Sequence, residues 1–177
     1  STIADGAAAA VLTDVDTALG MPKAVVFRAI RHVNDFLPMA KRDVLAMEGP
    51  RVAWRQALET ARVGLDDLSL VEVHDCFTIA ELLIYEAMGL TEPGEGRRAI
   101  DEGWTEKDGK LPVNPSGGLK SKGHPVGATG LSMHVLAARQ LCGSAGEIQI
   151  PDAALVGILN MGGAMVANYA SVLERLR

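Results

Sequence analysis

Residues 73–77 read Val-His-Asp-Cys-Phe and place an imidazole and a thiol two residues apart, directly after an apolar run. The chain of 177 residues holds one further cysteine. A free thiol beside a histidine acts as a nucleophile, as a metal ligand or as an acid and base, or it fills space in the core as a small hydrophobe. From His74 and Cys76 alone, all four roles stay open.

A second candidate group lies downstream, where residues 114–130 place glycines on both sides of His124. Glycine lets a backbone approach another group closely. The spacing lacks the lysine of a P-loop and does not match the glycine pattern of a dinucleotide-binding turn. Pro125 occupies the expected first position of a helix, so His124 sits where it can face a cleft. The loop is therefore expected to present His124, although a plain turn into a buried helix would also explain the glycines.

A metal site is not predicted. A structural zinc site needs four ligands at close, paired spacings, and His74 with Cys76 supplies two. The remaining candidates, His32, His134 and Cys142, lie in segments with no evident reason to converge. Cys142 stands near a helix end without a neighbouring histidine or acid, and we interpret it as structural.

Hydrophobic patterning predicts an α/β order for the elements that position these residues. Helices are expected over 14–19, 54–61, 77–88 and 131–141, and strands over 23–33, 68–73, 153–159 and 164–173, the last two forming an antiparallel pair joined through 160–163. His74 and Cys76 then lie between the carboxyl end of a buried strand and the next helix. Ligands bind at that place in open α/β sheets.

The apolar helix expected at 131–141 carries few charges, which is typical of a helix buried between layers, here against a partner domain. Residues 89–112 are polar and rich in glycine, and they read as a surface excursion within one domain. Residues 7–13 form a short apolar run that we expect to be a strand.

Composition excludes several classes of function. The chain is 48% apolar with a net charge of −5, which indicates a packed protein and argues against nucleic acid as a partner. No apolar run reaches the roughly eighteen residues of a membrane span. Two cysteines without a disulfide framework, and no signal peptide or peroxisomal ending, favour a cytoplasmic, bacterial setting. The chain begins without methionine, and we expect a piece of a longer protein.

Three motifs in this order resemble the carboxyl-terminal portion of a thiolase, closest to the sterol-carrier-protein type. They are the stretch Val71–Phe77, the block 114–130 with its Gly123-His124-Pro125, and the closing Asn160-Met161-Gly162-Gly163. Residues 4–9 also resemble the segment that leads into the last strand of the first half of such enzymes. The similarity runs over essentially the whole chain.

The resemblance implies a thiolase-like α/β fold, in which each of two similar halves is a mixed five-stranded sheet with helices on both faces, stacked as αβαβα layers. Residues 1–20 would be the tail of the amino-terminal half, with its last strand. Residues 21–177 would form the carboxyl-terminal thiolase domain, with the polar excursion at 89–112. The helix at 131–141 would meet the missing half.

The resemblance also implies an activity. Thiolases cleave 3-ketoacyl-CoA with CoA, or run the reverse Claisen condensation, through an acyl group held on a cysteine of the first half. We therefore expect the carboxyl-terminal part of an acetyl-CoA acetyltransferase-like enzyme that takes acyl-CoA as substrate, with no permanently bound cofactor. The complete enzyme would be a homodimer or tetramer, and this chain alone would be inactive.

The family pattern places roles on particular residues. An imidazole suits the role of a general base, so His124 would be the base for the nucleophilic thiol. Cys76 would move a proton to or from the acetyl carbon. His74 would donate, directly or through water, to the thioester oxygen, and a backbone N–H near Gly162 would help to form an oxyanion hole.

Three further residues, Ser1, Gly123 and Pro125, are expected to contact CoA. Common biosynthetic thiolases carry an asparagine where His74 stands and the acid/base cysteine where Asn160 stands. This chain differs at both positions, as the sterol-carrier-protein type does, so Cys76 would supply the sulfur that position 160 lacks.

Two other functions remain open. One is a thiolase-fold enzyme of retro-aldol or other C–C bond chemistry that acts with a small, acyl-CoA-associated partner protein. Such relatives tend to lose the histidine of the Gly-His-Pro motif or the thiol, and this chain keeps both. The other is a binding or assembly subunit that has kept only the fold, which the absence of a cysteine in a strand-to-helix turn upstream of Ser1 would favour.

Overall fold

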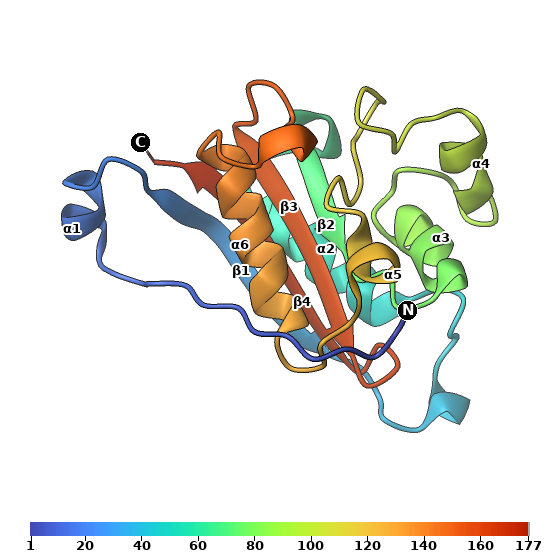
Figure 1. Ribbon diagram of the computed structural model, residues 1–177. Coiled ribbons are helices and arrows are strands. Elements are labelled where there is room, and N and C mark those ends of the chain that lie inside the picture. Colours follow the sequence, from blue (N-terminus) through green and yellow to red (C-terminus); the bar gives the residue numbers. More distant parts are fainter. Residues whose placement is uncertain (177) are drawn as a thin grey trace.

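A mixed β-sheet organises the molecule, and its strands follow the order β1-β4-β3-β2 (Figure 1). The structure is a computed structural model and describes residues 1–176. The strands are β1 (Val25–Asn34), β2 (Leu70–Val73), β3 (Leu155–Gly162) and β4 (Ala167–Arg175). β4 pairs antiparallel with β1 and with β3, whereas β2 pairs parallel with β3. The predicted α/β class and the mixed sheet are confirmed.

Helices cover both faces of the sheet, as predicted. α2 contacts β1 and β4 on one face, and α6 contacts β2, β3 and β4 on the other (Figure 1). The helices are α1 (Val15–Leu19), α2 (Glu48–Ala61), α3 (Thr78–Ala87), α4 (Gly96–Asp101), α5 (Gly118–Lys122) and α6 (Thr129–Leu141), with 3-10 turns at Met39–Lys41, Leu65–Asp67 and Gly146–Ile148. α2 begins earlier than expected, because Pro50 lies in its first turn, where a missing N–H breaks no helical bond. Within residues 1–176, no helix is both long and apolar enough to cross a membrane.

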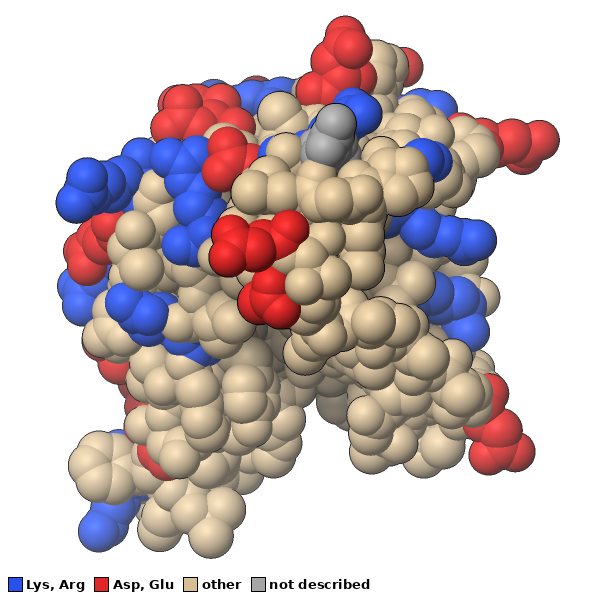
Figure 2. Space-filling view, turned by 90° about the vertical axis from the view of Figure 1, so that its left-hand side faces the viewer, with Lys and Arg blue, Asp and Glu red and all other residues tan. Residues whose placement is uncertain are grey.

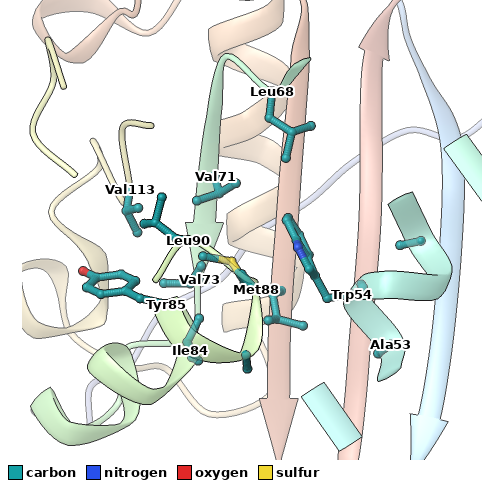
Figure 3. Close-up of a cluster of buried hydrophobic side chains, with 14 of the residues drawn as sticks. Ala53, Trp54, Leu68, Val71, Val73, Ile84, Tyr85, Met88, Leu90 and Val113 are labelled. Carbon is teal, nitrogen blue, oxygen red and sulfur yellow. The ribbon is translucent and has the colours of Figure 1, made fainter. Parts of the chain in front are cut away.

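β2 is buried on both faces, and its alternation decides which way the residues after it point. Val71 and Val73 join the core under α2 and α3 (Figure 3), while Leu70 joins the core under α6. Because side chains alternate along a strand, Glu72 lies on the same face as Leu70, and His74 continues that series. The strand thus directs His74 toward the α6 side of the sheet.

The sheet has four strands among the described residues, so the prediction of five strands was wrong. Its place beside β2 is taken by a single parallel bridge between Val71 and Val113. Pro112 has no N–H to donate, and Asn114 takes a left-handed φ of +49°. The pairing of this segment with β2 is therefore limited to Val71. The Val71 N–H donates to the Pro112 carbonyl, and the Asn114 N–H donates to the Val71 carbonyl.

Three further expectations change in detail. Residues 7–13 form no strand and run along the exposed surface toward α1 (Figure 1), so the assignment of residues 1–20 to another half stays a prediction. The antiparallel pair at the carboxyl end is confirmed, but Asn160 and Gly162 belong to β3, and the turn follows at 163–166. The excursion at 89–112 contains α4, and it packs onto the core through buried Leu90, Ala99 and Leu111.

Candidate active site

The two histidines that the sequence singled out meet at one end of the sheet. His74 follows β2 and points to the α6 side, and His124 lies in the loop that leads into α6. Their ring centroids are 5.0 Å apart, with the planes edge-on at 86°. The structure therefore brings together two residues that are fifty positions apart in the chain.

The His74 ring is fixed by Asn160 on the neighbouring strand β3. His74 Nδ1 lies 2.7 Å from Asn160 Oδ1. An amide oxygen only accepts, so Nδ1 carries the proton and Nε2 is left free. Burial lowers the pKa of His74, the bond to Asn160 opposes that shift, and the nearby His124 adds to it. In the neutral ring Nε2 accepts rather than donates, so of the two routes expected from the sequence only the one through a water molecule fits this tautomer, and the contact with a thioester oxygen stays a prediction.

The His124 ring is fixed in a similar way by the first residue of α6. His124 Nδ1 lies 2.7 Å from Thr129 Oγ1, and Thr129 Oγ1 donates in turn to the Pro125 carbonyl at 3.2 Å. Because the hydroxyl proton is already used, Oγ1 accepts from Nδ1–H, and Nε2 keeps its lone pair. A free Nε2 is what a general base needs. Sequence reasoning missed Thr129, although it stands five residues after His124.

Cys76 is half-buried and free of a disulfide. Burial raises the pKa of its thiol, and a bond from the backbone N–H of Phe77 opposes this only in part. The thiol is therefore protonated at neutral pH. This suits a proton donor.

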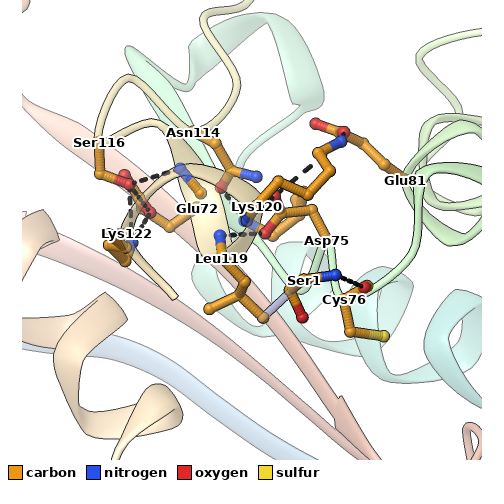
Figure 4. Close-up of polar contacts among 12 residues, drawn as sticks. Ser1, Glu72, Asp75, Cys76, Glu81, Asn114, Ser116, Leu119, Lys120 and Lys122 are labelled. Carbon is orange, nitrogen blue, oxygen red and sulfur yellow. Dashed lines mark hydrogen bonds and ion pairs between the residues drawn. The ribbon is translucent and has the colours of Figure 1, made fainter. Parts of the chain in front are cut away.

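Residues 1 and 2 lie between Cys76 and His124. The Ser1 nitrogen donates to the Cys76 carbonyl at 2.7 Å (Figure 4), and the His124 N–H donates to the Thr2 carbonyl at 2.8 Å. The amino-terminal segment thereby links the strand end that carries the thiol to the loop that carries the base.

Two glycines allow this segment to lie against the Gly-His-Pro loop. A Cβ on Gly123, whose φ is +86°, would come 2.9 Å from the Cβ of Ala4, and a Cβ on Gly6 would come 2.9 Å from Pro125. Gly123 and Pro125 line a groove of about 530 Å³ between the amino-terminal segment and α6. Ser1 is not among the residues that line this groove, so the three residues expected to contact CoA occupy two places. Their contact with CoA stays a prediction.

Gly162, the residue expected beside the oxyanion hole, is exposed at the end of β3. It lies two positions after Asn160 and therefore on the same side of the strand. Gly163, Ala164 and Met165 follow it with left-handed φ angles of +58°, +50° and +69°. A turn of this kind is strained for non-glycine residues, and its role in binding an oxyanion stays a prediction.

A buried carboxylate that sequence reasoning missed ties the site to the loop at 114–123 (Figure 4). Glu72 is 1% exposed, accepts from Ser116 Oγ at 2.8 Å and lies 3.7 Å from Lys122 Nζ. Burial raises the pKa of Glu72, and the lysine opposes the shift. Next to it, Val73 N–H donates to Asn114 Oδ1 at 2.8 Å. The only signal in the sequence was an acidic residue inside an otherwise apolar strand.

Comparisons with known proteins agree on one family. A family model described as Thiolase C-terminal domain-like matches residues 33–175. The acetyl-CoA acetyltransferase of Methanothermobacter thermautotrophicus is 41% identical over 165 residues, covering 92% of this chain and 43% of that protein. Sterol carrier protein 2 of Oryctolagus cuniculus is 42% identical over 171 residues, covering 92% of this chain and 31% of that protein. The chain thus spans less than half the length of these relatives.

A solved structure shows the same fold. The Ltp2-ChsH2(DUF35) aldolase superposes with a TM-score of 0.76 at 20% sequence identity, over 86% of this chain and 40% of that chain. At this identity the likeness concerns the arrangement of the elements and not the chemistry.

Proposed function

Because this chain belongs to the thiolase C-terminal domain-like family, we propose that it is the carboxyl-terminal part of an acyltransferase that cleaves 3-ketoacyl-CoA with CoA, or forms it by Claisen condensation. The resemblance of its motifs to the carboxyl-terminal portion of a thiolase is confirmed by the family match. The observation that carries the proposal is the convergence of His74 and His124, each with its Nδ1–H bonded and its Nε2 free.

In the proposed reaction, His124 acts first. A cysteine expected in the amino-terminal half attacks the ketone carbonyl of the substrate, and His124 Nε2 accepts its thiol proton. The bond from His124 Nδ1–H to Thr129 holds the ring in the tautomer that this step requires. Once charged, the imidazolium stabilises the negative charge on the adduct and later returns the proton.

Negative charge then develops on a carbonyl oxygen and has to be met by donors. His74 Nε2 holds a water molecule that donates to the thioester oxygen. The backbone N–H groups around Gly162 face the oxygen of the attacked ketone. Loss of one donor costs about 100- to 1,000-fold in rate in comparable oxyanion holes. The bond to Asn160 keeps His74 in the orientation that this water needs.

Cys76 completes the cleavage as an acid. When the C–C bond breaks, its electron pair moves to the α-carbon of the departing acetyl-CoA, and the Cys76 thiol supplies the proton. The resulting thiolate takes a proton from the incoming CoA thiol, which releases the acyl group from the nucleophile. A thiol whose pKa is raised by burial enters this step in the protonated state it needs.

The missing amino-terminal half is the proposed partner, and an uncovered part of the sheet is placed to receive it. On the α6 side, Phe27 and Ile30 of β1 pair with Leu173 and Ser171 of β4. Phe27, Ile30 and Tyr169 are 39%, 54% and 43% exposed. Figure 2 views the molecule from the side of α1 and β1, and its lower half shows few charged side chains around a hollow. A homodimer or tetramer of the complete enzyme and a cytoplasmic location belong to the same proposal.

The test uses the full-length protein with a 3-ketoacyl-CoA and CoA. Cys76→Ala is expected to abolish C–C cleavage and with it thiolysis, while acylation of the nucleophile by acetyl-CoA, which breaks no C–C bond and is followed by intact mass, survives. His124→Ala is expected to damage both steps. Cys142→Ala removes the other thiol and serves as the matched control, with thiolysis unchanged.

Two results would contradict the proposal. Equal thiolysis by the wild type and by Cys76→Ala would remove the acid/base role of the thiol. Retro-aldol cleavage of a 3-hydroxyacyl-CoA by the wild type, without any thiolysis, would assign the site to the alternative C–C bond chemistry.

A further inference from the structure

Asp75 stands between His74 and Cys76, and its side chain takes a different direction from both. It is 1% exposed. Its carboxylate accepts the backbone N–H of Leu119 at 2.7 Å and that of Lys120 at 3.3 Å (Figure 4). These two amides belong to α5, the short helix that precedes the Gly-His-Pro loop.

The backbone of α5 is shaped around this carboxylate. A Cβ on Gly118 would come 2.2 Å from Asp75 Oδ2, 2.6 Å from Cγ and 2.8 Å from Oδ1, so the three nearest atoms all belong to Asp75. Gly118 also has a left-handed φ of +63°. Position 118 therefore tolerates no side chain as long as Asp75 keeps its place.

The link continues to the catalytic base. The N–H of Gly123 donates to the Leu119 carbonyl at 3.0 Å, and His124 is the next residue. A bond from the Leu119 N–H to the Asp75 carboxylate and one from the Gly123 N–H to the Leu119 carbonyl thus join Asp75 to the residue before His124. The neighbours of Asp75 in the chain are His74 and Cys76. A movement of α5 relative to the end of β2 therefore changes the distance of His124 from His74 and Cys76.

We propose that Asp75 is a positioning residue that sets His124 relative to His74 and Cys76 by holding the backbone of α5. It takes no part in proton transfer, because it is buried and its oxygens already accept bonds from α5. The catalytic consequence rests on the proposed thiolase function, whereas the link itself is a property of this chain and is tested separately.

The ion pair of Lys120 is not what holds α5. Lys120 Nζ contacts Glu81 and lies 4.0 Å from Asp75 Oδ2, with its own side chain 34% exposed. At 4.0 Å the ammonium is beyond hydrogen-bond distance of Asp75 Oδ2, so the bonds from the backbone of α5 to Asp75 do not depend on it. Lys120→Ala removes the ammonium and keeps the backbone N–H, so it separates the two contributions and serves as the control variant.

The first experiment measures kcat and KM for thiolysis in the full-length protein. Asp75→Ala is expected to lower kcat about 100-fold with little change in KM, since a displacement of about 1 Å has that effect on aligned groups. Asp75→Asn keeps one acceptor oxygen and is expected to lose less, which also covers the case in which the alanine variant folds poorly. Lys120→Ala is expected to stay within about threefold of the wild type.

A double-mutant cycle tests the contact between the two residues. Gly118→Ala alone is expected to lower kcat about as much as Asp75→Ala, because its methyl group displaces the carboxylate. In the double variant the methyl group has no carboxylate to meet and only the strain of alanine at a left-handed φ remains, so the loss is expected to stay within about twofold of the worse single variant. A double loss equal to the product of the single losses would overturn the proposal.

The second experiment does not depend on activity. Hydrogen exchange of a peptide covering residues 116–124 is expected to accelerate in Asp75→Ala and to stay unchanged in Lys120→Ala. Unchanged exchange in Asp75→Ala, or an equal kcat loss in Lys120→Ala, would overturn the positioning role. A wild type without thiolysis but with the expected exchange pattern would contradict the proposed function alone, and an active wild type with an equally active Asp75→Ala would contradict the positioning alone.

Discussion

Gly130→Ala disturbs the hydrogen bond that fixes the His74 ring, and it does so from the opposite helix. A Cβ at position 130 would lie 2.9 Å from Asn160 Nδ2 and 3.8 Å from its Cγ. The Asn160 amide is the far end of a flexible side chain, so the added methyl group rotates the amide and moves neither β3 nor α6. Because the same amide accepts His74 Nδ1–H at 2.7 Å, the turn breaks or lengthens that bond.

Two contributions to the free energy of unfolding oppose each other in this variant. Alanine in place of glycine stabilises a helix interior by about 0.5–1 kcal/mol, and at Gly130, the second residue of α6, the gain is at most that. Loss of one hydrogen bond costs about 0.5–1.5 kcal/mol. The net change is expected to lie within about 1 kcal/mol of zero. The pKa of His74 instead moves in one direction: burial already lowers it and the Asn160 bond opposes this, so loss of the bond lowers it further.

Urea denaturation gives the free energy of unfolding, and an NMR titration of the His74 ring gives its pKa. Asn160→Ala is the matched control, because it removes the amide without the helical gain and should lower the same pKa at a larger cost in stability. In the full-length enzyme, a transition state that is stabilised about 1 kcal/mol less by the misoriented His74 corresponds to about a fivefold lower kcat. An unchanged His74 titration in Gly130→Ala, beside a lowered one in Asn160→Ala, would refute the reasoning.

Two further predictions concern stability. Burial lowers the pKa of His74 and His134. Below about pH 6.5 the unfolded chain therefore binds more protons than the folded chain. The free energy of unfolding falls there with decreasing pH, by at most about 1.4 kcal/mol per pH unit for each histidine. His134→Gln should flatten this acid slope in urea titrations, and an unchanged slope would contradict it. Gly157→Ala would place a Cβ 2.5 Å from the ring of Trp54 and should cost about 1–3 kcal/mol in urea. Gly162→Ala, where nothing lies within 4 Å, should leave stability nearly unchanged, and equal losses in the two variants would contradict the packing argument.

The positions of the candidate residues along the chain were predictable because they depend on local patterns. The apolar run before His74 marks β2, and the proline after His124 marks the approach to α6. Both patterns involve neighbouring residues. The structure places His74 directly after β2, as expected, whereas α6 begins at Thr129, four residues after the position expected from Pro125. The missing fifth strand also had a local cause, since Pro112 stands in the segment that would have formed it.

The state of each group was not predictable in the same way. The Nε2 atom of His74 is free because Asn160, 86 residues away, occupies Nδ1. The Cys76 thiol is protonated because the fold buries it and thereby raises its pKa. A residue type alone indicates neither the partner nor the burial.

The sequence by itself indicated which residues are candidates for the chemistry, placed His74 at the end of a strand and showed to which family the motifs are similar. Only the tertiary structure decided that the two histidines meet, which nitrogen of each is free, and that Asp75 holds a helix 44 residues away. The physical reason is that periodicity and turn residues act between neighbours, whereas a hydrogen bond across the site depends on how distant segments cross.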